Sequence, residues 1–99
     1  MKPAAFRHSL NGKAPPAGVA AALQALWWAA SGDWGKAHRI VMSGHDQECA
    51  WVHAYLHRVE GDLDNARYWY RQARRKPATQ QLSLEWDEIV AALLGERRR

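Results

Sequence analysis

Histidine and cysteine recur every four residues in the segment HDQECAWVHAYLHRVE, at His45, Cys49, His53 and His57. Residues four apart lie on the same side of a helix, so this spacing can present metal-binding or catalytic side chains along one face. Each step of four rises about 6 Å, however, and the whole set spans about 18 Å, too far to bind a single ion. The spacing therefore predicts a pair of ligands at most.

His53 and His57 form the pair that can share one metal ion, since neutral imidazoles are borderline ligands suited to zinc. Glu60 follows on the next turn, and His38 in the preceding predicted helix can complete the cluster if it faces the pair. Ala54 stands where the HExxH motif of metalloproteases has its glutamate, which disfavours that chemistry. We place first a structural role, in which the histidines form hydrogen bonds between packed helices. A metal-binding or hydrolytic site is the alternative.

Cys49 has His45 and His53 as its neighbours at four residues' distance, a spacing compatible with a Cys–His nucleophile. No glycine-rich turn offers an oxyanion hole, and a lone helical cysteine is usually a small buried apolar residue. We therefore expect no catalysis at Cys49 and no enzyme activity. A single cysteine also excludes an intramolecular disulfide, which fits a reducing cytoplasm.

Aromatic and basic residues alternate in the stretch RYWYRQARRK at 67–76, a pattern compatible with stacking on nucleic-acid bases and contacts to phosphates. The basic residues share one side of the predicted helix, and cations near a helix C-terminus are favoured by its dipole. We expect a solvated surface here, without nucleic-acid binding and without a phosphate-binding loop. The candidate surface contacts are Tyr68, Arg67, Arg71 and Arg74.

The composition is that of one small globular domain. Of the 99 residues, 47% are apolar and 24% are charged, and six are tryptophan, which should dominate the core. The net charge of +4 includes three arginines at the C-terminus and selects no partner. The longest apolar run, 19–30, is shorter than the roughly 20 residues that span a bilayer, so no membrane segment is expected.

Helical periodicity dominates from Val19 onward, and the punctuation between helices repeats. GDWGKA at 32–37 and GDLDNA at 61–66 lie 29 residues apart, and each offers a glycine to end one helix and an aspartate to cap the next. These signals predict an all-α fold of two stacked antiparallel hairpins plus a C-terminal helix. The predicted helices are 19–31, 33–43, 46–60 and 63–75, with a fifth between the N-cap Ser83 and Gly95.

The corner GDLDNARYWYRQA resembles the second half of a tetratricopeptide repeat, with Gly61, Ala66, Tyr70 and Ala73 at the family's positions. The period of 29 differs from the family's 34 or so, and the first helix of each hairpin lacks its signature residues. The strings ALWWAASGDWGKAH, AWVHAYLHRVEGD and NARYWYR together resemble a family of small, functionally uncharacterised bacterial proteins with a tetratricopeptide-like fold. That resemblance implies a fold and no activity.

The sequence predicts an irregular N-terminal arm at 1–18 with one short turn around 5–10, a single helical domain at 19–95, and a basic tail at 96–99. Stacked hairpins commonly bind a peptide or protein partner, and a short array needs its ends covered. We therefore expect a scaffold for protein interactions in the cytoplasm. A homodimer is compatible with this expectation. The alternative is a small metal-binding or hydrolytic protein that uses His38, His53, His57 and Glu60, with zinc as the metal.

Overall fold

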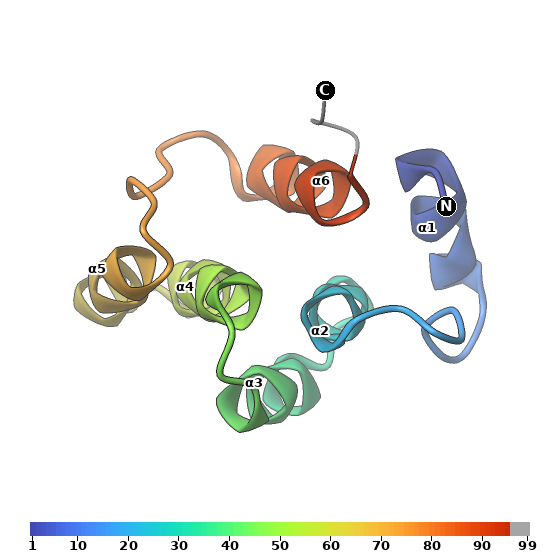
Figure 1. Ribbon diagram of the computed structural model, residues 1–99, viewed down its shortest axis with the longest axis horizontal. Coiled ribbons are helices and arrows are strands. Elements are labelled where there is room, and N and C mark those ends of the chain that lie inside the picture. Colours follow the sequence, from blue (N-terminus) through green and yellow to red (C-terminus); the bar gives the residue numbers. More distant parts are fainter. Residues whose placement is uncertain (96–99) are drawn as a thin grey trace.

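The structure is a computed structural model that describes residues 1–95, and every regular element in this range is a helix (Figure 1). The predicted all-α class is confirmed for these residues, and the predicted tail at 96–99 lies outside them. No helix in the described range combines the length and the apolar character needed to cross a bilayer. The elements are α1 (Pro3–His8), the 3₁₀ helix η1 (Ser9–Asn11), α2 (Ala21–Ala30), α3 (Trp34–Ser43), α4 (Gln47–Glu60), α5 (Leu63–Gln72) and α6 (Leu82–Leu93).

Glycine–aspartate corners join α2 to α3 and α4 to α5, as the repeated sequence predicts. Gly32 and Gly61 adopt left-handed φ angles of 97° and 86°, which glycine accepts without steric penalty. Asp33 and Asp62 each accept a hydrogen bond from the backbone amide three residues further on, at 3.0 and 3.3 Å. Each corner thus ends one helix and begins the next within two residues.

Helix α4 is the centre of the fold, with α2, α3, α5 and α6 packed around it (Figure 1). As a result, every side chain from Cys49 to His57 is buried. Ala37 in α3 and Ala66 in α5 are also buried, and their small side chains allow the helices of each pair to approach closely. The histidines of α4 therefore lie inside the packing, although the sequence separates them from its apolar side.

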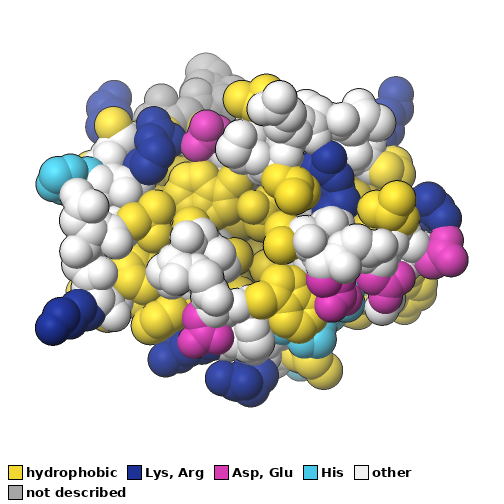
Figure 2. Space-filling model, turned by 180° about the vertical axis from the view of Figure 1, so that it is seen from behind, with side chains coloured by type: hydrophobic (Ala, Val, Ile, Leu, Met, Phe, Trp, Pro, Cys, Tyr) yellow, Lys and Arg dark blue, Asp and Glu magenta, His cyan; other side chains and the backbone are white. Residues whose placement is uncertain are grey.

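Helix α6 packs on α2 and α4 on the side away from α3, and α1 packs beside α6 (Figure 1). The indole Nε1 of Trp86 in α6 donates to the carbonyl of Leu26 in α2 at 2.9 Å. Phe6 in α1 is fully buried, with its ring centroid 5.9 Å from that of Trp86. From behind, apolar side chains reach the surface in a band across the middle of the molecule (Figure 2). A helix with a core residue thus occupies the segment for which the sequence predicts an irregular arm.

Helix α5 ends three residues before its predicted end. Arg74 adopts a left-handed φ of 60°, and the amide of Arg75 donates to the carbonyl of Tyr70 at 2.9 Å. This hydrogen bond is that of a Schellman-type helix end, which turns the chain out of the helix before Pro77 is reached.

Helix α6 begins at Leu82, and its N-cap residue is Gln81. The prediction of Ser83 as the N-cap is wrong. The amides of Leu84 and Glu85 both donate to the carbonyl of Gln81 at 3.0 Å, which places Ser83 inside the first turn.

Candidate metal site of three histidines

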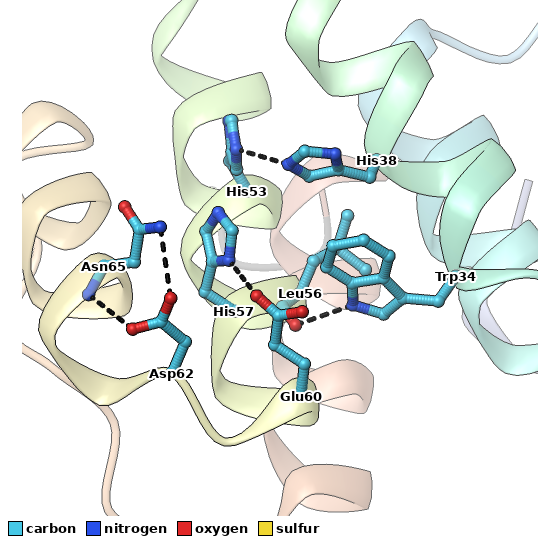
Figure 3. Close-up of polar contacts among 8 residues, drawn as sticks. All are labelled: Trp34, His38, His53, Leu56, His57, Glu60, Asp62 and Asn65. Carbon is cyan, nitrogen blue, oxygen red and sulfur yellow. Dashed lines mark hydrogen bonds and ion pairs between the residues drawn. The ribbon is translucent and has the colours of Figure 1, made fainter.

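Three histidine rings from two helices converge on the side of α4 that faces α3 (Figure 3). The Nε2 atoms of His38 and His53 lie 3.1 Å apart. The centroids of the three rings are 4.8 to 5.3 Å from one another. One ring nitrogen from each of His38, His53 and His57 lies within 4.8 Å of the other two. The structure therefore brings together all three histidines of the predicted cluster.

Two tryptophans stack on rings of this cluster, one on His38 and one on His53. The indole of Trp34, one turn before His38 in α3, stacks on the His38 ring with centroids 4.6 Å apart. Trp69 of α5 stacks on His53 at 4.0 Å. The Trp34 indole is fixed in turn, because its Nε1 donates to the carbonyl of Leu56 in α4 at 2.8 Å (Figure 3). Helices α3 and α5 thus each supply an aromatic wall to the histidines.

Glu60 contacts the third ring from the other side. The Nδ1 of His57 donates to the Glu60 carboxylate at 2.7 Å, and the opposite ring nitrogen points toward His53 (Figure 3). In metal proteins a ligating histidine commonly donates its second N–H to a carboxylate in this way. Asp62 also lies near His57, but it caps α5. Acidic side chains gather beside a histidine at the lower right of Figure 2.

The environments of His38 and His53 favour neutral imidazoles. Burial lowers the pKa of His53 to about 4, and the neighbouring His38 and His57 act in the same direction. Burial and the nearby His57 also lower the pKa of His38, against a smaller opposing effect of Glu60. At neutral pH these rings are uncharged. Their nitrogen lone pairs are then available as ligands or hydrogen-bond acceptors.

The donor set matches the chemistry of zinc. Zinc binds imidazole nitrogens at about 2.0–2.1 Å in tetrahedral geometry, which places two ligand nitrogens about 3.3 Å apart. The His38 and His53 nitrogens already have nearly this separation. Side-chain rotation has to bring the third nitrogen closer. Three protein ligands leave the fourth position of a zinc ion open.

His45 and Cys49 lie apart from the cluster. His45 is exposed in the loop before α4, so the series of four histidine and cysteine residues does not form one helical face. Cys49 is buried, and its burial and its hydrogen bond to Asp46 raise the pKa of its thiol to about 12. A thiol that remains protonated is a poor nucleophile. The structure thus offers no support for catalysis at Cys49.

The predicted surface residues of α5 do not form one cluster. Arg67 pairs with Asp64 on the same helix, and the Arg71 guanidinium lies 5.9 Å from the Tyr68 ring centroid. Arg74 instead lines a cleft of about 490 Å³ between the ends of α3 and α5, which we call the α3/α5 cleft. His53 lines the same cleft, so the cleft adjoins the histidine cluster.

A buried ion pair is the main polar feature that the sequence analysis missed. Glu85 of α6 is 1% exposed; its carboxylate accepts a hydrogen bond from Arg58 at 2.7 Å and another from the Tyr70 hydroxyl at 2.5 Å. Burial and this hydrogen bond raise the pKa of Tyr70. The sequence does carry a signal for the burial of Glu85, because Glu85 precedes Ile89 by four residues and so shares the apolar stripe of α6. The pair and the Tyr70 hydroxyl together join α4, α5 and α6, and among the described residues no metal-ligand cluster includes them.

Comparison with protein-family models, with curated proteins and with solved structures finds no match to this chain. The candidate site therefore has to be interpreted from its own geometry and chemistry.

Proposed function

We propose that this protein binds one transition-metal ion of the zinc class through His38, His53 and His57. The observation that carries the proposal is the convergence of three imidazoles from two helices, with Glu60 on the far nitrogen of one ring. We therefore place metal binding, which is the alternative in the sequence analysis, ahead of a purely structural role of the histidines. A structural hydrogen bond needs only two rings, whereas here three converge.

Burial and charge support the proposal. His53 and His57 are 5% and 6% exposed, and the low pKa of His53 keeps its ring neutral near pH 7. Neutral imidazole is the form that binds metal, so little proton release opposes binding at this ring. Glu60, a member of the cluster that the sequence predicts, acts on His57 as an orienting acceptor.

The test is zinc content and zinc affinity of protein purified without a histidine tag. We expect one zinc per chain, and loss of binding in the variants His38→Ala, His53→Ala and His57→Ala. His8→Ala is the matched control, because His8 is exposed on α1, away from the cluster. Zinc below about 0.1 per chain after saturation and dialysis, or binding unaffected by all three substitutions, would refute the proposal.

Glu60→Gln separates an orienting role from a ligand role. Removing the charge of a carboxylate that orients a ligand typically weakens metal binding about 10- to 100-fold. We expect Glu60→Gln to retain one zinc per chain at this lower affinity. Abolished binding would show that Glu60 is itself a ligand.

We further propose that the two hairpins are tetratricopeptide-like. Support comes from the packing of α2 with α3 and of α4 with α5, and from the burial of Ala66, Tyr70 and Ala73 at positions where the repeat family places conserved types. The period and the first helices depart from the family pattern. Within residues 1–95, α6 packs on α2 and α4 and does not form part of a third stacked hairpin.

A second candidate function is protein interaction through α5, in a cytoplasmic protein. Helix α5 packs principally on α4, and Leu63 and Tyr68 on it are 54% and 45% exposed. The partner is a peptide, a protein or a second copy of the chain, while nucleic acid is not expected. Sedimentation of the wild type and of Tyr68→Glu tests this: self-association that the substitution abolishes supports a homodimer. If the protein is monomeric and no partner co-purifies with it from lysate, the proposed interaction is contradicted.

A further inference from the structure

We propose that the α3/α5 cleft binds a small organic anion whose acidic group pairs with Arg74 and whose oxygen reaches the metal beside His53. The part of the proposal that concerns metal contact rests on the proposed function. The part that concerns Arg74 does not, because it follows from the backbone and the cleft alone.

Arg74 occupies a backbone conformation that other helix ends in this chain give to glycine. Helices α2, α4 and α6 are followed by Gly32, Gly61 and Gly95, with φ angles of 97°, 86° and 86°. Arg74 takes the same place after α5 with a φ of 60°. A side chain in this region carries a steric penalty that glycine avoids. The chain thus keeps arginine where glycine would favour folding, as expected when the side chain has a function.

The cleft has the size and lining of a small-molecule site. Its volume of about 490 Å³ lies within the roughly 300–1,000 Å³ usual for such sites. Val41, Met42 and Ala50 give it apolar surface. Trp69 adds an aromatic wall, held by its stacking on His53. These walls suit a ligand with an apolar body.

The charges in the cleft favour an anion. Among the described lining residues, Asp46 is the one carboxylate, and it accepts a hydrogen bond from the Cys49 amide at 2.8 Å as the cap of α4. Arg74 is the permanent cation, and His45 lies on the same lining. A guanidinium offers two parallel N–H donors that match a carboxylate or a phosphonate.

His53 links the cleft to the candidate metal site. Its ring lines the cleft, and its Nε2 lies 3.1 Å from that of His38. A zinc ion held by three imidazoles keeps a fourth position for a further ligand. An anion seated between Arg74 and His53 can therefore supply an oxygen to that position without displacing a protein ligand.

The experiment measures binding of benzoate and phenylphosphonate by calorimetry, to the wild type and to Arg74→Gly, with and without zinc. These probes share a ring and differ in the acidic group. We expect Arg74→Gly to bind the preferred probe at least tenfold more weakly and to unfold about 4 °C higher, because glycine relieves the backbone. Arg71→Ala is the control, since it removes the same charge from α5 outside the cleft, and its binding should match the wild type.

The outcomes separate this inference from the proposed function. Tighter binding of benzoate assigns a carboxylate ligand, and tighter binding of phenylphosphonate assigns a phosphate-like one; both support the inference. Equal affinity in the wild type and Arg74→Gly, no binding of either probe at millimolar concentration, or a lower melting temperature in Arg74→Gly would overturn it. If zinc fails to bind but Arg74→Gly still weakens anion binding by metal-free protein, the proposed function alone fails. If zinc raises the affinity for the preferred probe, the anion reaches the metal, and an unchanged affinity refutes that contact.

Discussion

His53 is the histidine of the candidate site that contacts Trp69, His38 and the α3/α5 cleft. Its ring stacks on Trp69, lies 3.1 Å from the His38 nitrogen and lines the α3/α5 cleft. Burial of the ring and the neighbouring His38 and His57 oppose a charged imidazole at this position. His53 therefore offers an unprotonated nitrogen donor to the candidate site.

Metal-free protein should lose stability in acid because of this residue. His53 protonates at about pH 6.5 in the unfolded chain and at about pH 4 in the folded protein. Between these values the unfolded state binds more protons, so the free energy of unfolding falls as the pH falls. Through His53, the free energy of unfolding is lower near pH 4 than at pH 7 by about 3 kcal/mol. The lowered pKa of His38 acts in the same direction.

Urea denaturation at pH 7 and at pH 4.5 measures this effect. Carboxylates also protonate in this window, so the comparison is with His53→Gln, which keeps a polar side chain but cannot take up a proton. We expect the variant to lose clearly less stability on acidification than the wild type. An equal loss in both proteins would show that His53 is not the origin of the acid sensitivity.

Among the connections between helices, the loop between α3 and α4 sets how these two helices place their histidines. Gly44 in this loop has an ordinary negative φ, so its backbone does not require glycine. Space does: a Cβ at Gly44 would lie 2.4 Å from the Cys49 sulfur and 3.1 Å from its Cβ. The burial of Cys49 against this loop explains its position better than any reactive role.

Gly44→Ala should destabilise the protein by about 1–3 kcal/mol, the usual effect of overpacking a buried contact. Cys49→Ala removes the clashing sulfur, so the double variant should be more stable than the sum of the two single effects predicts. Denaturant titration of the four proteins in this cycle gives the coupling energy. Additive effects within about 0.3 kcal/mol would contradict the contact.

In the molecule as a whole, α6 is held to α2, α4 and α5 by both apolar and ionic contacts. Trp86 reaches the backbone of α2, and Phe6 of α1 packs on its other side. Glu85 joins α6 to Arg58 in α4 and to Tyr70 in α5. In the described residues, helices far apart in sequence are thus joined through one buried carboxylate.

Glu85→Ala should destabilise the protein by about 3–5 kcal/mol, because it leaves the Arg58 charge partly buried without its partner. The double variant Arg58→Met, Glu85→Leu removes both charges and should recover most of this loss. Thermal unfolding at pH 7 distinguishes the two. A double variant as unstable as Glu85→Ala would show that the ion pair is not the source of the effect.

Local signals in the sequence are sufficient to predict the helices from α2 onward and the two glycine–aspartate corners. The Gly61–Asp62 corner was predicted because one residue favours left-handed φ and the next caps amides, and both effects act within a few residues. The sequence did not predict the features that depend on a contact between distant segments or on a residue in an unusual conformation. Phe6 becomes a core residue only because α6 lies beside α1, and Arg74 ends α5 in a conformation that arginine rarely adopts.

In the candidate site, the sequence places His53 and His57 on one side of a helix, since helical periodicity fixes that relation. It left His38 as a candidate, and it did not identify the cleft or the stacking of Trp69 on His53. These features depend on the folded structure, because the rotation of α3 and α5 about α4 depends on side-chain packing across the whole core. Local pattern sets which residues a helix presents, and packing between helices sets what those residues meet.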